Sequence, residues 1–169
     1  MPRNMRMLWC CMGSIGSIGG SLVSVSTLGG LTLPYVTYVG GSIDFSDQNL
    51  FLFQAPNLET VGGTLSLGNN TICALDVSAL SSVGGDLDLS SNTLFSFTVA
   101  INLTVNGVID LSDNGYGEFD FDFTATANVN ADYVDLTGNF HVNANCTTTG
   151  YCLWLPGSNN NTGCEVCEA

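Results

Sequence analysis

The sequence contains no lysine, and its only two arginines, Arg3 and Arg6, lie among the first six residues. Fifteen Asp and Glu side chains, all of them after residue 43, give the chain a formal net charge of −13. Proteins that bind nucleic acid neutralise phosphates with Lys and Arg, so this composition excludes nucleic acid as a partner. It also argues against phosphate, nucleotide and anionic-lipid sites, because there is no basic cluster and no phosphate loop.

A long apolar run is missing too. Residues 7–43 carry no charge, but Gly, Ser and Thr interrupt them, and a spanning helix needs about twenty mostly apolar residues. We therefore expect no membrane span in this chain. The stretch from Met7 to Met12 faintly resembles a signal peptide but lacks a convincing cleavage site, so we interpret it as mature sequence or part of a longer precursor.

The sequence gives little support for a catalytic function. The chain has one histidine, His141, with no nucleophile at a recognisable spacing and no Gly-x-Ser-x-Gly elbow. Aspartates recur so regularly that no pair stands out as an acid/base couple. We therefore predict a protein that is not an enzyme, and a glycan-active enzyme is the least favoured alternative.

What the chain does contain is an internal repeat. Gly-Gly follows a valine at positions 39, 61 and 83, and Val105 opens an equivalent unit one equal step later. A related unit begins at Ile18, and its distance to Val39 is one residue shorter than the regular step of 22 residues. At the other end, Val134 follows its equivalent Ile109 after a step that is three residues longer than the regular one, so one coil carries an insertion. A period of about 22 residues indicates a solenoid, whose coils bury their apolar sides only by stacking on neighbours.

Apolar residues recur at fixed places in the unit, which predicts short parallel strands round a narrow core. Four columns carry this pattern: Ile43, Leu65, Leu87 and Ile109; Phe45, Leu67, Leu89 and Leu111; Leu50, Ile72, Leu94 and Tyr116; Phe53, Leu75, Phe97 and Phe119. We expect Gly-Gly to turn the backbone at dihedrals closed to other residues. Gln48, Asn70, Asn92 and Asn114 form a polar column, and its three asparagines are predicted to bond backbone groups inside a corner, with exposed turns as the alternative.

The string Val-Gly-Gly-x-Leu-x-Leu-x-x-Asn resembles a leucine-rich repeat of the receptor L-domain type and is similar to repeats of fungal GPI-anchored cell-wall glycoproteins. The likeness covers roughly residues 18 to 139, with three residues instead of two between its first apolar positions. The resemblance implies surface display, adhesion, wall or matrix organisation and ligand binding, with no shared catalytic residues.

These observations predict an all-β, right-handed parallel β-solenoid, leucine-rich-repeat-like, of about six coils of roughly 22 residues. Strands spaced ~4.8 Å apart would make a slab roughly 25 to 30 Å long. We assign residues 18–145 to the solenoid, 1–17 to an N-terminal extension or cap that could contact another subunit, and 146–169 to a cysteine-rich cap.

Sequons and cysteines indicate the secretory route. N-linked glycosylation is predicted at four sequons, which begin at Asn69, Asn102, Asn145 and Asn160. The alternative is that an asparagine-rich repeat produces such triplets by chance. The chain has seven cysteines, and four of them suggest a disulfide-stapled cap, with a zinc site as the weaker alternative: Cys146, Cys152, Cys164 and Cys167. Cys10 or Cys11 could link to that cap or to another subunit. Cys73, next to an inward column, is expected to be a buried thiol.

The outward strand position reads Asp44, Ser66, Asp88, Asp110 and then Asp135, so it is acidic in all but one of these units. A solvated acidic face is the favoured interpretation. Weak calcium binding is the alternative, with Asp88, Asp110 and Asp113 as candidates and no other cofactor expected. Asp110-x-Ser112-x-Asn114-Gly115 opens like a calcium loop, but Phe121 stands where the bidentate glutamate belongs.

Together these features predict an extracellular, N-glycosylated structural or adhesive protein of a cell surface, wall or matrix. Its expected partners are further copies of itself, joined end to end into a fibre, or other extracellular proteins and glycans. A ligand- or glycan-binding receptor module is the alternative, for which exposed aromatic side chains on one sheet face would be the distinguishing feature. The aromatic columns are expected to point inward.

Overall fold

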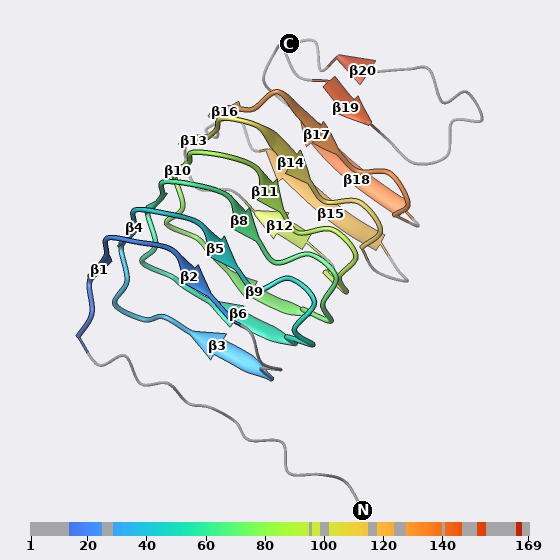
Figure 1. The fold of residues 1–169 in the computed structure, drawn as a ribbon. Coiled ribbons are helices and arrows are strands. Elements are labelled where there is room, and N and C mark those ends of the chain that lie inside the picture. The colour runs from blue at the N-terminus through green and yellow to red at the C-terminus, as the bar shows by residue number, and fades with distance from the viewer. Residues whose placement is uncertain are drawn as a thin grey trace, which may run out of the picture.

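The computed structural model describes residues 14–24, 29–94, 96–98, 102–114, 118–123, 128–139, 141–146, 152–154 and 165–166. Every regular element in these ranges is a β-strand, so the all-β prediction is confirmed. Strands of successive coils pair in parallel, for example Leu65 with Leu87. The described part is therefore a parallel β-solenoid of stacked coils that keeps the predicted period, and Figure 1 shows it from the side.

The coils present three faces. The first sheet has six strands: β1 (Ser17–Ile18), β4 (Tyr38–Val39), β7 (Thr60–Val61), β10 (Ser82–Val83), β13 (Asn102–Val105) and β16 (Asn128–Asn130). The second sheet has eight: β2 (Leu22–Val23), β5 (Ile43–Asp44), β8 (Leu65–Ser66), β11 (Leu87–Asp88), β14 (Val108–Asp110), β17 (Tyr133–Asp135), β19 (Cys152–Trp154) and β20 (Glu165–Val166).

The third face carries two three-stranded sheets. One contains β3 (Gly30–Thr32), β6 (Leu52–Gln54) and β9 (Ala74–Asp76), and the other contains β12 (Ser96–Thr98), β15 (Glu118–Phe123) and β18 (His141–Cys146). Strand pairs in the described residues are parallel except β19 with β20, which are antiparallel. The number of coils, their handedness and the disulfide-stapled cap stay predictions.

The described members of the apolar columns meet between the three faces, as predicted, whereas Tyr116 and the side chains of Phe97 and Phe119 lie outside the described part. Ile43, Leu65 and Leu87 are fully buried and stack in register. Two further columns, which the sequence pattern did not reveal, line the turn that follows the third face: Leu33, Ala55 and Val77; Val36, Leu58 and Leu80. The turn closes through backbone bonds, such as Leu58 N–H to the Ala55 carbonyl at 3.1 Å. The core is thus wider than the four expected columns.

A ladder of buried asparagines fills the corner between the second sheet and the third face. The Asn70 side-chain oxygen accepts the backbone N–H groups of Gln48 and Leu50 in the preceding coil, both at 2.9 Å. Its amide nitrogen donates to the carbonyls of Phe45, at 2.9 Å, and Leu67, at 2.8 Å. Bonds to the preceding coil and to their own coil recur at Asn92, Asn114 and Asn139. The prediction that asparagines lie inside the turn is confirmed, and we call this turn the asparagine corner.

The residue before each of these asparagines has a left-handed backbone. Its φ is positive at every described coil with such an asparagine: 53° at Asn69, 51° at Ser91, 54° at Asp113 and 72° at Gly138. Left-handed φ is least costly for Gly and is tolerated by Asn and Asp, which accounts for most of this column. Ser91 is the member least suited to it.

Close stacking explains the glycines of the corner between the first and second sheets, which we call the glycine corner. A Cβ at Gly40 would lie 2.6 Å from the carbonyl oxygen of Gly19, one coil earlier. In the same way, a Cβ at Gly62 would clash with the carbonyl oxygen of Gly40. Positive φ among the described glycines occurs only at Gly138. The prediction that Gly-Gly supplies unusual dihedrals is therefore wrong; the missing side chain is what the stack needs.

The insertion is spread unevenly round its coil. Asp110 pairs with Asp135 on the second sheet, Asn102 pairs with Asn128 on the first, and Ser96 pairs with Asp120 on the third face. The step between paired residues is thus longest on the first sheet and shortest on the third face. Strand pairing stays parallel on each face while the connecting segments absorb the change in length. The N-terminal unit keeps its predicted shorter step, because Ile18 pairs with Val39.

Candidate functional surface

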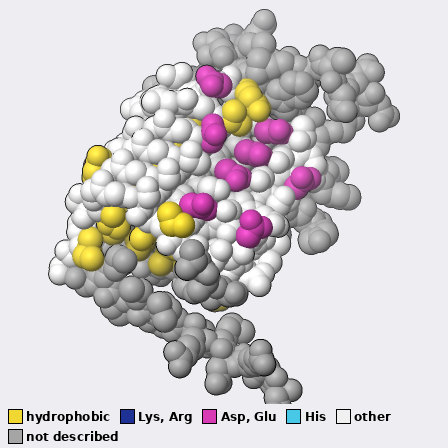
Figure 2. Space-filling view, in the orientation of Figure 1, with side chains coloured by type: hydrophobic (Ala, Val, Ile, Leu, Met, Phe, Trp, Pro, Cys, Tyr) yellow, Lys and Arg dark blue, Asp and Glu magenta, His cyan; other side chains and the backbone are white. Residues whose placement is uncertain are grey.

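The second sheet presents an acidic face. Asp44, Asp88, Asp110 and Asp135 point outward at equivalent, half-buried positions, with Ser66 completing the row. In Figure 2 acidic side chains gather over the part of the molecule where Figure 1 draws the second sheet. Asp88 and Asp110 are direct neighbours on adjacent strands, where like charges destabilise a sheet.

Hydroxyl residues hold these carboxylates in place. The Asp110 Oδ1 accepts the backbone N–H of Ser112 at 2.9 Å and its hydroxyl at 2.6 Å. Asp88 makes the same two bonds to Ser90, at 3.0 and 2.7 Å, and also accepts the Ser66 hydroxyl at 3.2 Å. The row is therefore fixed locally by an Asp-x-Ser turn. Sequence reasoning missed this role, although the Asp-x-Ser spacing itself recurs along the second sheet.

The calcium candidates come together only in part. Asp88 and Asp110 lie side by side, while Asp113 sits at the asparagine corner, where its carboxylate occupies the space that a Cβ at Gly138 would need. Within the described residues, no group of three or more His, Cys, Asp or Glu side chains is placed to hold a metal ion. Calcium binding at these three aspartates stays a hypothesis.

Two of the four sequons lie in the described part, and both asparagines are exposed. Asn69 stands at the asparagine corner, where its side-chain amide donates to the Asp47 carboxylate, and the Thr71 hydroxyl donates to the Leu50 carbonyl at 3.1 Å. Asn102 begins β13 on the outer side of the first sheet. The side chain of Asn145 in β18, and Asn160, lie outside the described residues, so glycosylation stays a prediction.

Most of the cysteines also lie outside the described residues. Cys146 ends β18 and Cys152 begins β19, but only their backbone is described, and the other four predicted partners are Cys10, Cys11, Cys164 and Cys167. Their pairing stays a prediction, as does any part played by the His141 side chain.

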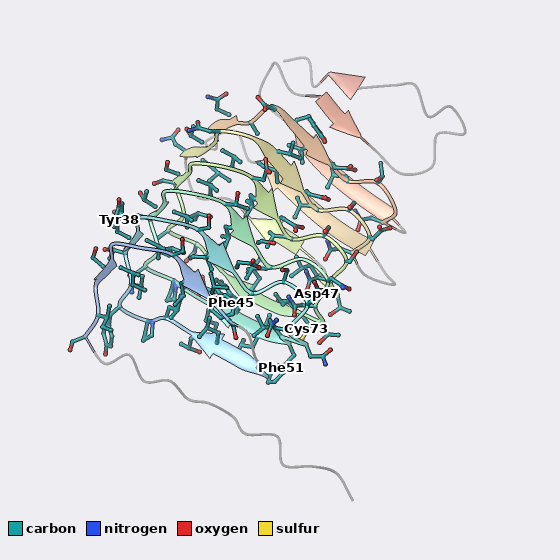
Figure 3. All side chains as sticks on the ribbon, viewed as in Figure 1. Tyr38, Phe45, Asp47, Phe51 and Cys73 are labelled. Atoms are coloured by element: carbon teal, nitrogen blue, oxygen red, sulfur yellow. The ribbon has the colours of Figure 1, made fainter. Side chains whose placement is uncertain are left out.

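Cys73 is exposed, so the prediction of a buried thiol is wrong. It follows the buried Ile72 where the chain leaves the asparagine corner, and its side chain points away from the core. Its sulfur lies 3.6 Å from the Phe51 carbonyl oxygen. Figure 3 places Phe51 and Cys73 at the same corner, with Tyr38 on the opposite side of the coil.

Exposed aromatic side chains are more numerous than expected. Phe45 and Phe53 point inward, as predicted, but four other aromatic residues are at least 37% exposed: Tyr35, Tyr38, Phe51 and Tyr133. Tyr38 belongs to the first sheet and Tyr133 to the second, so these side chains do not share one face.

The glycine corner carries a second ladder. The Ser21 hydroxyl oxygen accepts the backbone N–H of Ser42 at 3.1 Å, and the Ser42 oxygen accepts that of Thr64 at 3.1 Å. Further along the stack, the Asp86 carboxylate takes the place of the hydroxyl and accepts the backbone N–H of Val108 at 2.9 Å. The hydroxyls and the carboxylate of this corner are thus engaged in joining coils.

No described helix is long and apolar enough to cross a membrane. No family model matches the chain, and the comparisons with curated proteins and with solved structures found no match either.

Proposed function

We propose that this chain is a non-enzymatic, N-glycosylated structural or adhesive protein of a cell surface, wall or extracellular matrix. The observation that carries the proposal is the placement of Asn69 and Asn102, whose side chains are exposed on the outside of the coil. An N-linked sugar needs an exposed asparagine in a secreted protein. The repeat's resemblance to receptor L-domain and fungal GPI-anchored wall proteins supports the same conclusion.

The surface chemistry also supports a structural role. The second sheet gives one face of the body charges of a single sign, and the ladders at two corners lock each coil to the next. Such a body presents an extended surface on a rigid support. Self-association end to end into a fibre is the finer form of the proposal, and electron microscopy of native material tests it: dispersed particles under all conditions would count against the fibre.

The glycosylation test compares intact mass before and after enzymatic removal of N-linked sugars, on protein secreted from a eukaryotic host. We expect a mass loss on treatment, and a smaller loss in Asn69→Gln and in Asn102→Gln. Asn57→Gln is the matched control, because Asn57 is exposed but precedes Leu58-Glu59 and forms no sequon. An unchanged mass in the natural protein would reject the proposal.

A ligand- or glycan-binding module is the second candidate, favoured by Tyr35 and Tyr38, which are 59% and 43% exposed. Aromatic rings of this kind pack against apolar faces of ligands while their hydroxyls stay in water. Binding to a panel of glycans should then fall in Tyr38→Ala and persist in Tyr133→Ala. Equal binding by both variants would leave the structural role as the better account.

A further inference from the structure

The N-terminal coil supplies the first strand of three sheets. Within the described residues β1 pairs only with β4, β2 only with β5, and β3 only with β6. We call β1, β2 and β3, together with Ile15, the N-terminal edge. At the other end the second sheet closes differently, because β20 lies antiparallel to β19. A strand at a sheet edge offers backbone donors and acceptors to a partner strand.

Apolar side chains gather at this same end. Four of the six large hydrophobic side chains that are exposed in the described part lie between residues 15 and 38: Ile15, Val23, Tyr35 and Tyr38. Figure 2 shows several of the exposed apolar groups at the end of the molecule that carries β1. Ile15 immediately precedes Gly16 and β1, and Tyr38 lies on β4, the strand next to β1. Exposed apolar groups that cluster in this way mark an interaction surface.

Charge indicates what the edge can bind. All fifteen acidic residues lie after residue 43, while residues 7–43 carry no charge. Two copies of a chain with a net charge of −13 repel each other wherever their acidic faces meet. The N-terminal edge is where two copies can touch while their acidic rows point away from the contact. A second copy of this chain therefore fits it better than a charged partner does.

We propose that the N-terminal edge binds the N-terminal edge of a second copy, with β1 of one copy beside β1 of the other across a two-fold axis. A two-fold axis brings the same surface of both copies together and makes the two β1 strands antiparallel. The reverse arrangement, edge onto C-terminal end, would have to continue the second sheet past the antiparallel β20. The proposal rests on the self-association in the proposed function and deepens it: the first unit of any fibre is a head-to-head pair.

The experiment measures the association of the full chain by sedimentation over a range of concentrations. The protein is reduced, so that cysteines cannot link copies, and freed of sugar, so that the result does not depend on glycosylation. We expect a concentration-dependent dimer. Ser17→Asp and Ser17→Lys should each raise the dimer dissociation constant at least about tenfold, because Ser17 is exposed on β1 beside the axis and each variant brings like charges together. Tyr133→Asp, on the second sheet far along the chain, is the matched control and should leave it unchanged.

Mixing the two Ser17 variants distinguishes the arrangements. In a head-to-head pair the two Ser17 positions lie next to the two-fold axis, so an equimolar mixture of Ser17→Asp and Ser17→Lys brings opposite charges together and should recover the dimer. Failure to recover it, or an equal loss in Tyr133→Asp, would overturn the two-fold arrangement. A monomer at every concentration would overturn the proposal altogether and would favour residues 1–13 of the same chain as the cover of this edge. Neither result would bear on glycosylation, which the mass experiment decides separately.

Discussion

The side-chain oxygen of Asn92 accepts the backbone N–H of Ile72, one coil earlier, at 3.0 Å. The amide nitrogen of the same side chain donates to the carbonyls of Leu67, at 3.0 Å, and Leu89, at 3.1 Å. Asn92 is only 5% exposed, so water cannot easily replace these bonds. One side chain thus satisfies backbone groups of two coils at once.

Replacing Asn92 should therefore lower the free energy of unfolding. Asn92→Ala leaves the buried Ile72 N–H without its partner, while the Leu67 and Leu89 carbonyls keep the donors Asn70 and Asn114. We expect a loss of about 2 kcal/mol in the free energy of unfolding, measured in urea. Asn92→Asp should cost a similar amount, because a carboxylate cannot donate. Asn57→Ala is the control: it removes one exposed bond to the Pro34 carbonyl and should cost about 1 kcal/mol or less.

The glycine corner gives a second test, in which the same change is made at two equivalent places. Gly62→Ala puts a Cβ against the Gly40 carbonyl, so the coils must move apart, and we expect a loss of about 1–3 kcal/mol. Gly19→Ala, in the first coil, meets no atom within 4 Å and should change stability by less than about 0.5 kcal/mol. Equal losses would mean that backbone conformation, not stacking, selects glycine here.

Ser91 offers a stabilising change. Its φ of 51° suits Asn better than Ser, and Asn69 stands at the equivalent place one coil earlier. We expect Ser91→Asn to raise the free energy of unfolding by about 0.5 kcal/mol. The variant creates a sequon, so it is to be made in bacteria and followed by calorimetry. Gly138→Ala, at φ 72°, should move stability in the opposite direction.

The acidic row predicts a dependence on salt. Asp110→Asn keeps the oxygen that accepts from Ser112 but removes the charge beside Asp88, so at low salt it should stabilise the fold by about 0.5 kcal/mol. The gain should vanish in 1 M salt, where the Debye length is about 3 Å. Asp110→Ala, which also removes the acceptor, should destabilise the fold at both salt concentrations.

Calcium serves as the control for that experiment. If the row is a solvated face, calcium chloride and sodium chloride at equal ionic strength should raise the melting temperature equally. A larger effect of calcium, lost in Asp88→Asn, would instead support a bound ion.

Cys73 should react while the protein is folded. Its thiol is exposed, so iodoacetamide should label it in native, reduced protein, as peptide mass mapping would show. Cys73→Ser should change the free energy of unfolding by less than about 0.5 kcal/mol, since the thiol is not part of the core. Protection of Cys73 in the native state would contradict the described exposure.

The architecture was predictable because its signals repeat. Leu65, Leu87 and Ile109 recur at one spacing, and a period of this length admits little besides stacked coils. The asparagine corner was predictable for the same reason, because a polar column between apolar ones needs buried backbone partners.

The parts that were missed depend on contacts between coils rather than on local pattern. Gly62 could be seen to recur, but only the position of the Gly40 carbonyl shows why a side chain is excluded there. Cys73 follows an inward residue, and which way it points depends on the turn that the chain makes after the asparagine ladder. The exposure of Tyr38 could not be predicted, because the equivalent residues in the next two coils are Thr60 and Ser82 and so no aromatic column marks this position.

The bonds of the asparagine ladder reach only to the next coil, never beyond it. The number of coils can therefore change without altering the contacts between neighbouring coils. Duplicating one unit, such as residues 62–83, would lengthen the solenoid by ~4.8 Å, and each coil would still form the same bonds to its neighbours. The distance between the two ends of such a body is thus set by the number of its units alone.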